Sequence, residues 1–273
     1  MKANRSLAAL YRQQFASRSR SVIFLVIAWT LLGLLFAVVF KDLSRTAAQT
    51  IKIYQALPPA ILHSFNISND YLTHVEKFLS GQFLSVYMLA GGIFALFMGV
   101  GSIGGKIEDS TIANLLNKPF SRATIYLTQA ITNIVSLIIA SAATGAIMYG
   151  LFAAFSGQKS ISVQYFVSAF SGATIIFITV ALLGQLLGMV IGKVKAQAAG
   201  SAFIVFSFFL NGLGALAGAP TWLQNTSIFY YFNTVQLRDF YNLDMRRLAV
   251  LLVASAVFLI IGTLWFRRKD LYL

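Results

Sequence analysis

The sequence predicts an all-α membrane protein with six transmembrane helices. Of its 273 residues, 58% are hydrophobic and only 11% are charged, and the mean hydropathy is +0.76, whereas soluble domains carry about 25% charged residues. Six apolar stretches are long enough to cross a hydrocarbon layer of ~30 Å as helices. They lack the period-two alternation of barrel strands, which favours helices. As one transmembrane domain, residues 1–273 contain predicted spans at approximately 22–40, 83–103, 125–152, 164–192, 196–218 and 248–266.

The first 20 residues are predicted to form an amphipathic helix that lies on the cytoplasmic membrane surface. Apolar and polar residues recur there at helical spacing, and most of the arginines lie off this stripe. A basic flank that only obeys the topology rule is the alternative. The stripe contains Leu7, Leu10, Tyr11, Gln14, Phe15 and Arg18.

Residues 41–81 and 219–247 are the two long segments predicted on the extracellular side. The second is rich in the aromatic residues typical of membrane interfaces. The first contains four residues of metal-binding type, but their spacing matches no helical zinc motif, so a role in shaping the outer ends of the first two spans is favoured. These residues are His63, Asp70, His74 and Glu76.

A polar island, EDSTIANLLNKPFSR at residues 108–122, separates the second span from the third. It holds the only adjacent carboxylates of the chain, Glu108 and Asp109. Asp109 and Ser110 are both suitable N-caps, so an amphipathic helix of two to three turns is expected, ending at Pro119. Such a helix would dock a partner; an ordinary solvated loop is the alternative. Its apolar face would contain Ile112, Leu115 and Leu116, and its polar face Asn114 and Asn117.

Small, polar and aromatic residues within the spans are candidates for a pathway or a dimer interface. Gly184 and Gly188 lie one turn apart, where small residues let helix backbones approach closely. Gly184 and Gly188 could serve either packing between helices of the same chain or the seam of a dimer, and the sequence leaves both alternatives open. Polar side chains in spans typically bond neighbouring helices, and aromatic residues of the fifth span would face lipid or an apolar cargo. The polar and aromatic candidates are Gln129, Asn133, Gln185, Phe206 and Asn211.

The distribution of basic residues predicts the orientation. Thirteen of the 21 Lys and Arg residues fall in the termini and the even-numbered connections, and eight fall in the other connections. Because cytoplasmic segments carry the excess of basic residues, both termini and the polar island are predicted to be cytoplasmic. The net charge of +13 is thereby explained by topology and attraction to lipid headgroups, without a nucleic-acid partner.

All 29 charged side chains lie outside the six predicted spans. A charge at the bilayer centre costs about 2.5–3.5 kcal/mol even on insertion scales, so proton- and ion-coupled carriers keep one only where it acts. An uncharged interior therefore disfavours such a carrier. The glycines before Lys106 do not have the spacing of a phosphate-binding loop, so a pump of this sequence would need its motor on another chain. The absence of cysteine excludes disulfides and thiolate metal sites.

The polar island resembles the corresponding segment in the permease subunits of ABC-2 type ATP-binding cassette transporters. In that family an acidic residue and a Thr precede a leucine-rich turn, which is followed by a Pro, a small polar residue, an Arg and an Ile-Tyr-like entry into the third span. The resemblance extends to the basic N-terminus and to YQALPPAIL, FYYFNTVQL and FRRKDL. The matching residues are Glu108, Thr111, Leu115, Leu116, Pro119, Ser121, Arg122, Ile125 and Tyr126.

The resemblance implies a type V exporter-like fold in which the island is a cytoplasmic coupling helix. It implies a plasma-membrane permease that forms a pathway as a homodimer or heterodimer and is driven by separate ATPase subunits. ATP and Mg²⁺ would bind to those partners, while this chain would bind no cofactor or metal and catalyse no reaction. An amphipathic peptide, a drug or a lipid is the expected cargo. The residues implied in coupling are Glu108, Asp109, Ser110, Thr111, Asn114, Leu115, Pro119 and Arg122.

Two other classes of function remain as alternatives. A motor-independent channel or secondary carrier would work without an ATPase partner. A membrane enzyme would need catalytic groups gathered at one membrane face, and only the histidine-containing outer segment offers such groups.

Overall fold

Helices account for nearly all of the described residues, among which there is no strand. The structure, a computed structural model, describes residues 2–45, 74–117, 120–156, 161–214, 219–232 and 241–269, together with residues 237 and 239. Six of its helices are long and apolar enough to cross a membrane, which confirms the predicted all-α fold with six spans. The long helices are α1 (Lys2–Arg45), α5 (Leu84–Glu108), α7 (Arg122–Phe155), α8 (Val163–Ile191), α9 (Lys193–Gly214) and α12 (Met245–Arg268).

Short helical elements extend or connect these spans. The second span begins earlier than predicted, because α4 (Val75–Phe78) and a π-helical turn, η1 (Leu79–Phe83), continue directly into α5. A single turn, α6 (Ala113–Leu116), lies between α5 and α7. The short helices α10 (Thr221–Thr226) and η2 (Ile228–Tyr231) lie between α9 and α12.

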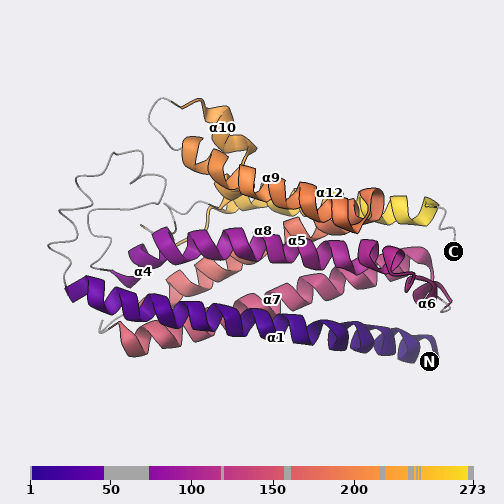
Figure 1. The fold of residues 1–273 in the computed structure, drawn as a ribbon, viewed down its shortest axis with the longest axis horizontal. Helices are drawn as coiled ribbons and strands as arrows, with labels where there is room; N and C mark the ends of the chain where they lie inside the picture. Colours follow the sequence, from indigo (N-terminus) through magenta and orange to yellow (C-terminus); the bar gives the residue numbers. More distant parts are fainter. Residues whose placement is uncertain are drawn as a thin grey trace.

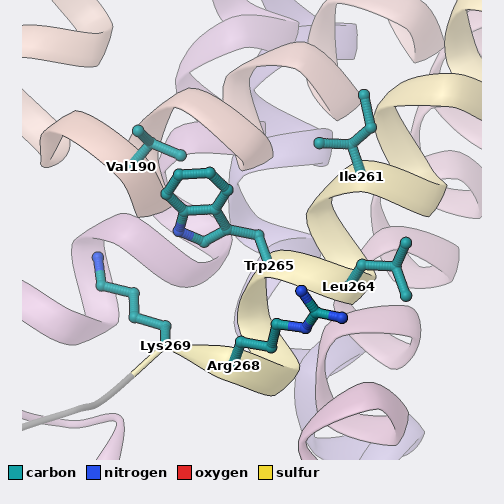
Figure 2. A pocket seen from close by; sticks show the side chains of 6 residues that line it. All are labelled: Val190, Ile261, Leu264, Trp265, Arg268 and Lys269. Carbon is teal, nitrogen blue, oxygen red and sulfur yellow. The ribbon is translucent and has the colours of Figure 1, made fainter.

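Helices α5 and α8 form the centre of the bundle. Helix α1 packs along α7 on one side, and α9 and α12 pack on α5 and α8 on the other (Figure 1). The start of α1, the turn α6 and the end of α12 lie together at one end, called here the terminal end, whereas α4 and α10 lie at the opposite end. A pocket opens at the terminal end beside α12 (Figure 2).

Glycines allow the backbones of α5 and α8 to come into direct contact. A Cβ atom on Gly99 would lie 2.0 Å from the carbonyl oxygen of Ala181, and one on Gly104 would lie 2.4 Å from that of Gly188. A Cβ atom on Gly184 would lie 2.6 Å from the carbonyl oxygen of Leu96. Since real Cβ atoms do not come so close to a carbonyl oxygen, these positions accept only glycine at the observed helix spacing.

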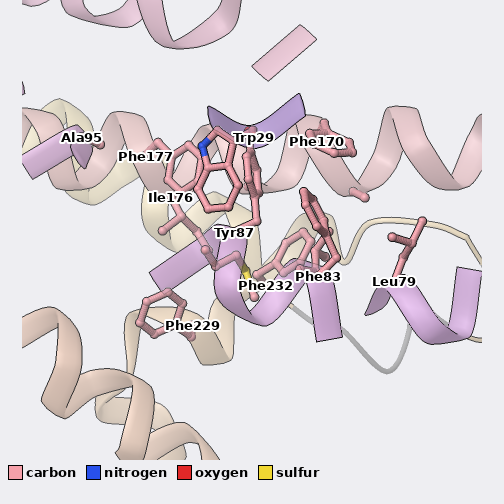
Figure 3. Close-up of a cluster of buried hydrophobic side chains, with 14 of the residues drawn as sticks. Trp29, Leu79, Phe83, Tyr87, Ala95, Phe170, Ile176, Phe177, Phe229 and Phe232 are labelled. Carbon is pink, nitrogen blue, oxygen red and sulfur yellow. The ribbon is translucent and has the colours of Figure 1, made fainter. Parts of the chain in front are cut away.

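A buried aromatic cluster joins α1 to the central helices (Figure 3). The ring of Trp29 on α1 meets Tyr87 on α5 edge to face, with centroids 4.9 Å apart, and Tyr87 meets Phe177 on α8 at 5.2 Å. The hydroxyl group of Tyr87 donates to Ser141 Oγ on α7 at 3.2 Å. One side chain from α5 thus contacts three other spans.

The amphipathic helix predicted over residues 1–20 is continuous with the first span, and its position at the membrane surface stays a prediction. Helix α1 is continuous from Lys2 to Arg45, because no glycine or proline occurs before Gly33 to interrupt it. The predicted stripe exists, but it packs on the protein: Leu10 and Gln14 are 1% and 4% exposed. Residues 2–20 therefore extend the first span along the bundle.

Candidate functional site

The connection between α5 and α7 begins with a sharp helix end. Asp109 is the C-cap of α5, and Ser110 has a left-handed backbone with φ of 55°. The amide of Ser110 donates to the carbonyl of Ile107 at 3.2 Å, and that of Ile112 donates to the carbonyl of Lys106 at 2.9 Å. The chain thus satisfies the carbonyls of Lys106 and Ile107 and leaves the axis of α5 at a left-handed residue, which is a common kind of helix end.

This helix end corrects the prediction of a coupling helix of two to three turns capped by Asp109 or Ser110. Only Ala113–Leu116 is α-helical, and its N-cap is Ile112, without a side-chain cap. The helix cannot begin at Ser110, because this residue has a left-handed backbone and the amide of Ile112 is bonded back to α5. Pro119, the predicted end, and Lys118 lie outside the described residues.

Ser110→Gly is expected to stabilise the protein. A non-glycine residue in the left-handed region costs about 1 kcal/mol, which glycine avoids. The apparent melting temperature of the detergent-solubilised chain should therefore rise, by about 2 °C for a chain of this size. Ser110→Ala is the control, because alanine keeps the strained backbone; an equal rise for both variants would show that the backbone of Ser110 is not the cause.

The apolar face of the turn is buried as predicted. Ile112 is 1% exposed and Leu115 is 9% exposed. They belong to a compact cluster, called here the anchor cluster, which contains one or more side chains from each of α1, α5, α7, α8 and α12. The turn is therefore fixed to five of the six spans. The buried members of the anchor cluster are Leu10, Ile103, Ile112, Leu115, Ile125, Tyr126, Met189 and Phe266.

The two adjacent carboxylates bind the start of the remaining span, α9. A carboxylate oxygen of Glu108 accepts a hydrogen bond of 2.6 Å from the amide of Lys193, the first residue of α9. A negative charge is favourable at this position because it meets the positive end of the helix dipole. The Lys193 ammonium lies 3.9 Å from Asp109. Between α8 and α9 lies only Gly192, whose φ of +84° and ψ of 165° are accessible essentially to glycine alone.

Arg122 is half-buried and contacts the end of another helix of the same chain; the hypothesis that it faces a partner stays a prediction. Its guanidinium group donates to the carbonyl oxygen of Lys269, just after α12. The Lys269 ammonium in turn donates to the carbonyl oxygen of Met189 near the end of α8. These cations satisfy carbonyl groups at helix C-termini, where positive charge is favourable.

Four polar residues in the interior next to the anchor cluster form a hydrogen-bonded network, called here the interior polar cluster. The guanidinium group of Arg18, on α1, donates to Asn133 Oδ1 and, at 3.3 Å, to Gln129 Oε1, both on α7. It also lies 3.4 Å from the carbonyl oxygen of Met98 on α5. Asn133 then donates to Gln185 Oε1 on α8 at 3.0 Å. The cluster consists of Arg18, Gln129, Asn133 and Gln185. Beside it on α1, Gln14 accepts a separate hydrogen bond of 3.2 Å from Thr132 Oγ1.

Arg18 therefore corrects the inference that the interior carries no charge. Sequence analysis missed it because Arg18 precedes the apolar run of the first span. Two signals were available: Leu10, Gln14 and Arg18 recur every four residues on one helix face, and Gln129 and Asn133 do the same on α7. The prediction that polar residues within the spans bond neighbouring helices is confirmed for Gln129, Asn133 and Gln185.

The remaining candidates of the pathway or dimer interface lie apart from this cluster. Gly184 and Gly188 are buried between α8 and α5 of the same chain, which supports packing within the chain over a dimer seam. Phe206 is 62% exposed on the outer face of α9. Asn211 is half-buried three residues before the end of that helix.

Glu76 has a structural contact at the opposite end of the bundle. It is buried, and its carboxylate accepts a 2.8 Å hydrogen bond from the amide of Ser162, the N-cap of α8. This contact supports the predicted role of the outer segment in shaping the ends of the spans. His74 is exposed, and His63 and Asp70 lie outside the described residues.

Comparison with known proteins gives one family. The chain matches the family model described as "ABC-2 family transporter protein" over residues 8–271. A comparison with curated proteins finds no match.

Proposed function

Because the chain belongs to the ABC-2 transporter family and is a permease subunit of an ABC transporter, we propose that it is an exporter driven through the α5–α7 connection by separate ATPase subunits. The terminal end of the bundle then faces the cytoplasm, with both termini. ATP and Mg²⁺ bind to the ATPase partner. The chain itself carries out no covalent chemistry.

The observation that carries this proposal is the attachment of the connection to all six spans. Its apolar side chains enter the anchor cluster with residues of α1, α5, α7, α8 and α12, and Glu108 holds the start of α9. The side chains of Asp109, Thr111 and Asn114 are exposed. A force applied to this surface by a moving partner is therefore transmitted to the whole bundle, as alternating access requires.

The proposed cargo is an amphipathic peptide, a drug or a lipid, moved along a pathway that the chain forms as a dimer. An apolar groove of about 660 Å³ between α7 and α8 supports a cargo of this kind. It includes Ile138, Tyr149 and Phe170 in its lining. The exposed aromatic face of α9, with Phe206 and Phe209, supports contact with a second permease or with lipid.

Asn114→Arg is expected to uncouple the ATPase without damaging the permease. Asn114 is exposed on α6, and its side chain makes no hydrogen bond within the part of the chain that the structure describes. The bulky cation would therefore disturb a docked partner without breaking such a bond. Loss of a docking contact worth ~1.4 kcal/mol should lower cargo-stimulated ATPase activity about tenfold in the reconstituted complex. Charge reversal of both Glu108 and Asp109 should abolish the stimulation as well, although it also removes contacts to Lys193.

The matched control is Asn225→Arg, the same substitution on an exposed position of the short helix α10 at the opposite end. This variant should keep wild-type stimulation. If Asn114→Arg also keeps it while the complex is intact, the α6 surface is not the docking site.

A further inference from the structure

The pocket between α8 and α12 at the terminal end has the shape and chemistry of a site for an amphiphile. Its volume is about 700 Å³. Ile261, Leu264, Trp265 and Arg268 follow one another on a single face of α12, at i, i+3, i+4 and i+7. The face is aliphatic toward the middle of the bundle and cationic toward its end (Figure 2). Val190 on α8 completes the apolar part, and Lys269 the cationic part.

The charge of the pocket is positive, since two of its six lining residues are cations and none of the six is acidic. Lys269 is held in place by the carbonyl oxygen of Met189, and its own carbonyl is held by Arg122. The exposed Arg268 stands at the mouth with a guanidinium group, which matches the geometry of a phosphate.

The pocket opens toward the membrane. Its apolar side chains are 40–51% exposed, and the exposed residues Val257 and Ile260 continue the same apolar surface along α12. Trp265, 51% exposed, lies one turn before Arg268, as tryptophan does at the level of the lipid headgroups. A ligand that fits this site has its apolar part in the hydrocarbon layer and its negative charge at the terminal end.

We propose that this pocket binds an anionic phospholipid of the surrounding bilayer. Its phosphate group pairs with Arg268, its glycerol region lies against Trp265, and an acyl chain follows Ile261, Leu264 and Val190. The proposed orientation of the exporter makes this an inner-leaflet lipid, but the binding itself needs no ATPase. A bound lipid would fill the space between α12 and the end of α8.

The proposal is tested by quenching of Trp265 fluorescence with brominated lipids in vesicles that contain the intact chain. Two vesicle preparations are compared, in which brominated phosphatidylglycerol or brominated phosphatidylcholine is diluted to the same mole fraction in unbrominated phosphatidylcholine. The brominated phosphatidylglycerol should be enriched at Trp265 about fivefold over the brominated phosphatidylcholine, because one interfacial cation attracts an anionic lipid by about 1 kcal/mol. The Trp265→Phe variant supplies the background from Trp29 and Trp222.

Arg268→Gln should remove this enrichment, whereas Arg267→Gln, which removes an equal charge from the neighbouring residue outside the pocket, should retain most of it. Equal losses in the two variants would mean general attraction to a basic surface and would overturn the proposal. Equal quenching by the two lipids in the wild-type chain would overturn it too. Displacement of the lipid by millimolar glycerol phosphate would assign the site to a soluble phosphate compound instead.

Discussion

Replacing Gly99 with alanine is expected to prevent α5 and α8 from closing against each other. The new Cβ atom would lie 2.0 Å from the carbonyl oxygen of Ala181, which is backbone and cannot rotate away. The helices would have to separate, which would also loosen the contacts of Gly104 and Gly188 along the same interface. We expect a loss of about 3 kcal/mol, at the upper end of the range for overpacking. The measurement is the fraction of detergent-solubilised chain that stays monodisperse as the temperature is raised.

Gly101→Ala is the matched control for this variant. Gly101 lies two residues further along α5, and nothing lies within 4 Å of a Cβ atom placed there. Since alanine is favoured over glycine in a helix by about 1 kcal/mol, this variant should be as stable as the wild type or more so. Similar losses at Gly99 and Gly101 would show that the helices do not pack at the observed distance.

Replacing Asn133 with leucine is expected to destabilise the protein by leaving Arg18 without its principal partner. Asn133 is completely buried, and it links Arg18 of α1 to Gln185 of α8. Breaking the pairing of a buried charge costs about 3–5 kcal/mol, and the partial exposure of Arg18 places the expected loss near the lower value. Thermal unfolding of the detergent-solubilised chain measures the effect.

Two further variants separate the charge from the volume of the side chain. Asn133→Asp keeps an oxygen for Arg18 but loses the donor to Gln185, so it should be more stable than Asn133→Leu and less stable than the wild type. The double variant Arg18→Met, Asn133→Leu removes the charge together with its partner and should recover more than half of the loss, because no buried charge is then left without a partner. Losses that simply add in the double variant would contradict a direct interaction between the two residues.

The number and approximate limits of the spans could be predicted because they depend on the length of apolar runs, which is a local property. The same holds for the buried face of the α5–α7 connection, where the spacing of Ile112 and Leu115 was sufficient. The length of α6 was not predictable in this way. It depends on the left-handed backbone of Ser110. Serine is at least as typical of a helix N-cap as of a left-handed conformation, so the sequence does not indicate which of the two forms.

The interior polar cluster shows why a count of charges within spans is insufficient. Arg18 lies before the apolar run, so a window placed on that run excludes it. Its burial depends on the continuity of α1 and on the packing of α1 against α7, which are tertiary properties. The amides of Gln129 and Asn133 make the burial of this charge tolerable, but sequence alone does not indicate which helix provides their partner.

The contacts of Glu108 and Arg122 could not be predicted from the sequence either. The sequence predicts both residues on a surface for a partner, and this stays a prediction; in the structure each also satisfies a backbone group at the end of another helix of the same chain. A charged residue near a helix end can cap a helix of its own chain or bind a partner, and it uses the same electrostatic interactions in both cases. Only the position of the neighbouring helix distinguishes the two roles.

The continuity of α1 has a mechanical consequence. At 44 residues the helix is about 66 Å long, roughly twice the thickness of a hydrocarbon layer. Arg18, Trp29 and Phe40 attach it to the bundle at three points along its length, so the helix moves together with its neighbours. A displacement of the N-terminal turns on one side of the membrane would thus reach the far side through a single stiff rod, without a change in any intervening loop.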